Sequence, residues 1–200
     1  MATAAWSSFD ANTGAFKRAW GAFGRTPIDV LPVPAAAGQP RGGRGAAQAQ
    51  LDTEGPGSPA FASPVHGIKV SNDGLVYVAD RGNRRVQVFT TDGKYVTQMF
   101  LNRGGPSNGS AAGVAFSPDP EQRFMYIADY GNSRIAAVDR KTLTVLYQFG
   151  QRSAKPGDFQ GLHHLSVDSK GNIYTGEVAP GARTQRFVYK GLAPRRRRTR

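Results

Sequence analysis

The sequence predicts an all-β chain of repeated four-stranded antiparallel sheets, the blades of a β-propeller. Three observations support this fold class. Short apolar runs alternate with polar residues at period 2, glycine-containing turns separate the runs, and the same order of runs recurs at intervals of just under fifty residues. A repeat of about 40–50 residues with four strands is typical of a propeller blade, which gains its stability by stacking on its neighbours.

The clearest repeat covers residues 63–100. Ile68 and Val70 alternate with polar residues, and an Asn-Asp-Gly turn follows them. The next run, Leu75 to Val78, is apolar at every position, which predicts a strand covered on both faces. Two more strands, separated by a Thr-Asp-Gly turn, are expected before residue 100.

The same order recurs twice towards the C-terminus, marked by Tyr126 and Tyr174 where the first repeat has Tyr77. The N-terminal residues match only the last two strands of the repeat, and a stretch rich in Ala, Gly and Pro follows them. We therefore expect about three and a half blades, arranged as a partial blade at 5–24, a low-complexity linker at 25–62, blades at 63–100, 113–150 and 162–192, and a basic tail at 193–200.

The chain of 200 residues is too short for a six-bladed ring at more than about forty residues per blade. Either it is a fragment or it assembles with another copy, and a start in mid-blade favours a fragment. The last blade shows only three strands, and in a closed ring its fourth could come from the other end of the chain. No signal peptide or membrane span is recognisable, and the compartment stays open. A secreted or periplasmic location stays open, because this sequence could lack a signal peptide that precedes it in the whole protein.

The net charge of +12 could indicate nucleic-acid binding, but its distribution argues against this. Five of the positive charges, Arg195 to Arg198 and Arg200, lie in the expected tail, and Arg41 and Arg44 lie in the linker. The tail is either a solvated terminal run or a sequence-independent phosphate-binding segment with steep salt dependence. We do not expect nucleic acid to be the partner.

All three histidines of the sequence fall just before the expected innermost strand of a blade, His66 in one and His163 with His164 in another. Ala112 stands at the equivalent place in the blade between them and offers no side-chain ligand. The innermost strands of a propeller line its central channel, where ligands bind. Imidazoles that converge there from different blades suit a metal such as zinc with an open position for water or substrate. The alternative is that they are polar channel residues, satisfied by backbone or water.

Acidic residues and arginines also recur, at the end of each second strand and the start of each third strand. The pairs are Asp80 with Arg85, Asp129 with Arg134, and Glu177 with Arg183. We expect these residues to form ion pairs or to bond the turn amides, in either case a structural role. Exposed pairs of this kind are each worth about 0–1 kcal/mol.

The segments YVADRGNRRVQVF and YIADYGNSRIAAV resemble the NHL repeat. This resemblance implies an NHL-type propeller, commonly six-bladed, of which the chain would form an incomplete part. The repeat is informative about the fold and says little about function.

Three segments, PVHGI, VYVADRGNRRVQVF and LHHLSVDSKGNIYTGE, further resemble the peptidyl-α-hydroxyglycine amidating lyases. That resemblance implies a zinc ion held by three histidines in the channel, with His66 and His163 at two of these positions. It also implies that Arg81 binds substrate, consistent with a guanidinium fork for a carboxylate. The third histidine and a tyrosine near the substrate would belong to a blade that this chain lacks, and His164 stands where the family carries an acidic residue.

Three functions remain as hypotheses, and the first is a non-catalytic scaffold. Such a scaffold would bind a small molecule or peptide in the central channel, or a protein on a propeller face. The second is a metal-dependent C–N lyase of the amidating type, with zinc at His66 and His163 and Arg81 on the substrate. The third is RNA binding through basic propeller faces. The residues leave open whether the chain is an enzyme.

Overall fold

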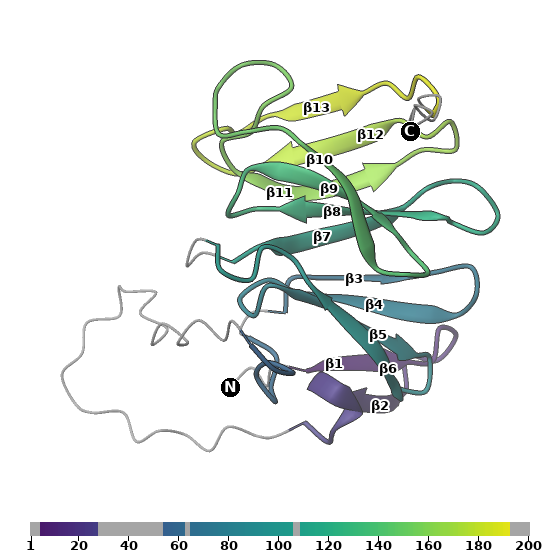
Figure 1. Ribbon diagram of the computed structural model, residues 1–200. Coiled ribbons are helices and arrows are strands. Elements are labelled where there is room, and N and C mark those ends of the chain that lie inside the picture. The colour runs from purple at the N-terminus through teal and green to yellow at the C-terminus, as the bar shows by residue number, and fades with distance from the viewer. Residues whose placement is uncertain (1–4, 28–53, 63–64, 106–108, 193–200) are drawn as a thin grey trace, which may run out of the picture.

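A computed structural model describes residues 5–27, 54–62, 65–105 and 109–192. It contains two four-stranded antiparallel sheets, one three-stranded sheet and one two-stranded sheet, stacked in chain order (Figure 1). The predicted all-β fold with four-stranded blades is confirmed, and the stack does not close into a ring. Within the described part of the chain, no helix has the length and apolar character needed to cross a membrane.

Each sheet is a meander of strands joined by short turns. The partial blade holds β1 (Trp6–Phe9) and β2 (Phe16–Trp20), followed by a 3₁₀ turn, η1 (Ala22–Gly24). The first full blade, in the order in which its strands pair, comprises β3 (Gly67–Val70), β4 (Leu75–Asp80), β5 (Arg85–Thr90) and β6 (Tyr95–Phe100).

The remaining two blades repeat this order. The second blade comprises β7 (Ala111–Phe116), β8 (Phe124–Asp129), β9 (Arg134–Asp139) and β10 (Thr144–Phe149). The third comprises β11 (Leu162–Val167), β12 (Ile173–Glu177) and β13 (Thr184–Phe187). Of the predicted linker, residues 28–53 lie outside the described residues, as does the basic tail at 193–200, and residues 54–62 pack on the first full blade.

The hydrophobic core lies between sheets rather than within any one of them. Strand β4 shows why, because its side chains alternate between two clusters. Tyr77 and Ala79 pack towards the second blade, whereas Val76 and Val78 pack towards Trp20 of the partial blade. A third cluster joins the second and third blades. This confirms that the apolar run of the second strand is covered on both faces, and it makes each blade depend on its neighbours.

Gly93 allows the partial blade to approach the first full blade closely. Its φ of +91° is a conformation that residues with a side chain rarely adopt. A Cβ at this position would lie 2.8 Å from the indole of Trp20. The turn between β5 and β6 therefore requires glycine for two reasons, its backbone conformation and the contact with the neighbouring sheet.

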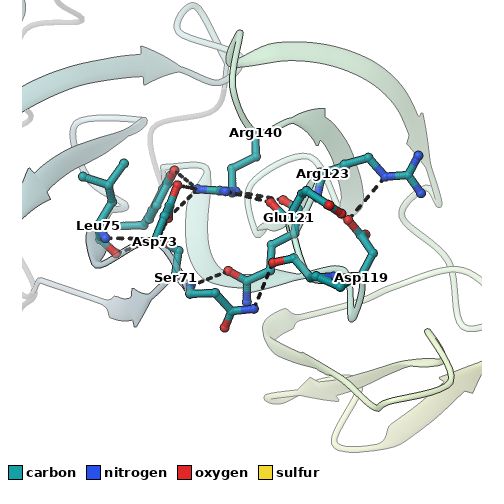
Figure 2. A network of polar contacts seen from close by, with 11 residues as sticks. Ser71, Asp73, Leu75, Asp119, Glu121, Arg123 and Arg140 are labelled. Atoms are coloured by element: carbon teal, nitrogen blue, oxygen red, sulfur yellow. Dashed lines mark hydrogen bonds and ion pairs between the residues drawn. The ribbon is translucent and has the colours of Figure 1, made fainter.

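A polar network joins the β3–β4 turn of the first full blade to the β7–β8 turn of the second (Figure 2). Arg140, only 5% exposed, donates to both carboxylate oxygens of Asp73 at 2.9 Å and to the Tyr77 hydroxyl at 3.1 Å. It also donates to the backbone carbonyls of Glu121 and Gln122. One guanidinium thus satisfies acceptors on both blades and fixes their relative position.

The repeated acidic and arginine residues are more buried than expected. Arg85 and Asp80 form an ion pair of 2.8 Å in which both side chains are fully buried, so the expectation of an exposed pair is wrong here. Arg183 and Glu177 also pair, at 2.6 Å. In the second blade Arg134 is exposed, and the buried Asp129 accepts from amide groups of Asn132 and Asn102 instead.

Thr175 carries a buried hydroxyl with no hydrogen-bond partner among the described residues. The two four-stranded blades have Val78 and Ile127 at this place in their second strands. Thr175→Val is expected to raise the free energy of unfolding by about 1 kcal/mol, because it removes an uncompensated polar group. Urea unfolding measures this, with the exposed Thr184→Val as control. A loss of stability in Thr175→Val would show that the buried hydroxyl contributes a favourable interaction and would contradict this expectation.

Candidate functional site

The innermost strands of the first full blade, the second blade and the three-stranded third blade lie side by side, with β7 in contact with both β3 and β11. The strands approach closely at two glycines, where there is no room for a side chain. A Cβ on Gly67 would lie 3.2 Å from the carbonyl oxygen of Ala112, and one on Gly113 would lie 3.3 Å from Nδ1 of His164. The starts of β3 and β11 are thereby brought to one surface, together with the histidines that they carry.

His66 is held in one orientation by backbone groups. Its N–H donates to the carbonyl of Ala79 at 3.1 Å, which extends the pairing of β3 with β4 by one residue. Its ring Nδ1 lies 2.7 Å from the carbonyl oxygen of Ala112. A carbonyl can only accept, so Nδ1 carries the proton and Nε2 presents its lone pair to the site.

The lone pair of His66 Nε2 faces two predicted site residues at once. Nε2 of His163 lies 3.1 Å from it, and Nη1 of Arg81 also lies 3.1 Å from it. The structure therefore brings together, from two blades, the three residues predicted to bind metal or substrate. Their assignment as metal ligands and substrate-binding residue stays a prediction.

Two further side chains complete the cluster. Ring nitrogens of His66, His163 and His164 all lie within 4.8 Å of one another. The ring of Tyr130 packs against Arg81, with the guanidinium carbon 5.0 Å from the ring centroid. The same ring contacts that of His163 edge-on, with the two centroids 5.9 Å apart. This geometry suits a cation–π contact.

Tyr130 was missed by the sequence analysis, although a signal was present. It follows the second strand of its blade directly, in YIADY, as Arg81 does in YVADR. The role of Ala112 was also missed, since its contribution comes from the backbone carbonyl and not from the side chain.

The electrostatics of the cluster favour neutral imidazoles. Burial lowers the pKa of His66, and the nearby charges of Arg81 and His164 act in the same direction against the hydrogen bond to Ala112. Burial, with His66, His164 and Arg81 nearby, lowers the pKa of His163 to about 4. Both rings are therefore neutral at pH 7, which is the form that binds metals.

These pKa shifts predict acid sensitivity. Between about pH 6.5, the ordinary histidine pKa, and the lowered pKa of His163, this imidazole binds a proton in the unfolded chain but stays neutral in the folded chain. The contribution of His163 to the free energy of unfolding should therefore fall as the pH drops through this window, whereas the raised pKa values of the buried Asp80 and Asp129 act in the opposite direction. Urea unfolding at several pH values in the presence of a chelator measures the slope. His163→Gln should reduce it, and an unchanged slope in that variant would contradict the prediction.

The donor set fits a transition metal. Two nitrogen ligands at about 2.0–2.1 Å from a tetrahedral zinc ion are themselves about 3.3 Å apart, and the Nε2 atoms of His66 and His163 are 3.1 Å apart. The hydrogen bond from His66 Nδ1 to a backbone carbonyl is the outer-shell contact that orients metal-binding histidines. Arg81 is a competing cation at the same lone pair, so metal binding would displace its hydrogen bond.

Comparison with known proteins supports the fold assignment. Residues 65–89 match the model of the NHL repeat family. The chain is 31% identical over 139 residues to NHL repeat-containing protein 3 of Homo sapiens, a match that covers 67% of this chain and 38% of that protein. The chain thus carries an NHL repeat in a β-propeller scaffold.

A solved structure with the same architecture is the β-propeller domain of Cps50 (Swd1) from Myceliophteria thermophila. It superimposes with a TM-score of 0.50 at 11% identity, over 90% of this chain and 45% of that chain. At this level of identity the likeness concerns the fold alone. The chain spans less than half the length of this structure and of the human relative.

Proposed function

We propose that the chain acts as an NHL-repeat propeller scaffold that binds a small-molecule or peptide ligand beside a metal ion held by His66 and His163. The observation that carries this proposal is the pair of Nε2 atoms 3.1 Å apart, one from the first full blade and one from the third. Zinc is the metal that we favour, because neutral imidazoles are among its usual ligands.

The residues around the imidazoles indicate the kind of ligand. Nη1 of Arg81 lies 3.1 Å from His66 Nε2, and the ring of Tyr130 packs against the guanidinium. A guanidinium fork suits a carboxylate. The ligand that fits this arrangement carries a carboxylate and an oxygen or nitrogen that can reach the metal.

An amidating-type C–N lyase is the second candidate, favoured by the position of Arg81 beside the histidines. A bound zinc ion would supply a Lewis acid and an activated water. Arg81 would hold the carboxylate of the substrate, and Tyr130 would orient Arg81. Release of glyoxylate from a peptidyl-α-hydroxyglycine measures this activity. A chain that binds zinc but releases no glyoxylate is a scaffold rather than a lyase.

Metal analysis of the purified chain tests the proposal. We expect about one zinc ion per chain after dialysis against a zinc-containing buffer and gel filtration. The same treatment of the variant His66→Ala with His163→Ala should leave the chain without metal. A wild-type chain free of zinc would overturn the proposal.

Arg81→Ala should strengthen zinc binding several-fold, because the guanidinium uses the lone pair that a metal requires. A carboxylate such as N-acetylglycine should strengthen zinc binding to the wild type by drawing Arg81 away, and should have much less effect in the variant. Isothermal titration measures both effects. Arg134→Ala is the control, since this arginine is exposed in the second blade. Weaker zinc binding in Arg81→Ala would contradict the competition.

A further inference from the structure

His163 and His164 are consecutive residues of strand β11, yet both contribute to the same cluster. In a regular strand consecutive side chains point to opposite faces, so one of them would face away. The pairing of β11 with β12 is irregular at this point. Leu162 pairs with Glu177 and His164 pairs with Gly176, so His163 is an extra residue on its strand.

This irregularity is a β-bulge, a feature that re-aims side chains. The rings of His163 and His164 have centroids 4.9 Å apart, and the ring of His164 stacks on that of His66 at 5.4 Å. Strand β7 carries the equivalent irregularity between Ala111 and Gly113. There the residues are small, and Gly113 leaves the space against which Nδ1 of His164 lies.

We propose that His164 is the third metal ligand, so that the β-bulge gives this chain a three-histidine site built from β11 and the residue before β3. This inference rests on the proposed function and adds a ligand to it. Three imidazole nitrogen donors suit zinc, cobalt or nickel and leave a coordination position open for a ligand atom.

The assignment differs from what the sequence resemblance implied. That resemblance required a third histidine from another blade and placed an acidic residue at the position of His164. In this structure the ring nitrogens of all three histidines are within 4.8 Å of one another, so no residue from elsewhere is needed to supply three donors.

Cobalt(II) and zinc binding to the full chain test the inference. His164→Ala and His164→Gln should each weaken zinc binding about 10–100-fold and change the visible absorption of the cobalt(II) complex. Ser166→Ala is the matched control, an exposed residue on the same strand and two positions further along. It should alter neither the zinc affinity nor the spectrum. Circular dichroism and urea unfolding confirm that each variant is folded.

The outcomes separate this inference from the proposed function. If the wild type binds zinc and both His164 variants bind it equally well with an unchanged cobalt spectrum, His164 is not a ligand and only this inference fails. If the wild type binds neither metal, the proposed function fails and this inference with it. Weakened binding in the Ala and Gln variants alike supports a direct nitrogen ligand.

Discussion

Arg85→Ala is expected to lower the free energy of unfolding by about 3–5 kcal/mol, because it leaves a buried carboxylate without its cationic partner. Asp80 and Arg85 are both fully buried and 2.8 Å apart. The guanidinium also donates to the carbonyl of Ala60 at 2.9 Å and lies 5.1 Å from the ring centroid of Phe23. The substitution therefore loosens residues 54–62 and the partial blade as well as the sheet itself.

The second full blade provides the matched control. Arg134 occupies the same place in the repeat but is exposed, and Asp129 is held by amides. Arg134→Ala should change stability by no more than about 0.5 kcal/mol. Urea unfolding of both variants with comparable m-values measures the difference. Equal losses in the two variants would show that burial of the ion pair has no special role.

The second large effect is expected for His66→Ala, which should weaken zinc binding more than about 100-fold, since even outer-shell partners contribute about 10–100-fold. His66 contributes one of the two nitrogens that define the site, and its orientation is fixed by Ala112. The loss of zinc affinity should therefore exceed that in the His164 variants, because the ring of His164 is exposed in the wild type.

Lys69→Ala is the control for His66→Ala, because Lys69 is an exposed residue of strand β3 and lies outside the cluster. It should bind zinc as the wild type does, as measured by competition with a chromophoric chelator. Equal affinity in His66→Ala and Lys69→Ala would contradict the role of His66.

The fold could be predicted from the sequence because local signals repeat. Alternation in Gly67–Val70, continuous apolarity in β4 and Gly-containing turns such as that at Gly93 specify strands and their connections without long-range information. The burial of Asp80 with Arg85 could not be predicted in this way. It depends on residues 54–62 and Phe23 covering the pair, and these are remote in sequence.

The candidate site was predictable in part. The positions of His66, His163 and Arg81 follow from the repeat register, and the structure brings them together. Three features depend on three-dimensional geometry instead. The β-bulge at His163 changes the side to which its neighbour points, Ala112 acts through its backbone carbonyl, and Tyr130 reaches Arg81 from the next blade.

In the proposed site, imidazoles from two blades hold one metal ion. X-ray absorption spectroscopy of the full chain loaded with one equivalent of zinc tests this most directly. A metal held by these imidazoles should show a first shell dominated by histidine nitrogens at about 2.0–2.1 Å, and the imidazole signal should be lost in the double variant with His66→Ala and His163→Ala. A first shell of oxygen atoms alone, or a spectrum that this variant leaves unchanged, would contradict it.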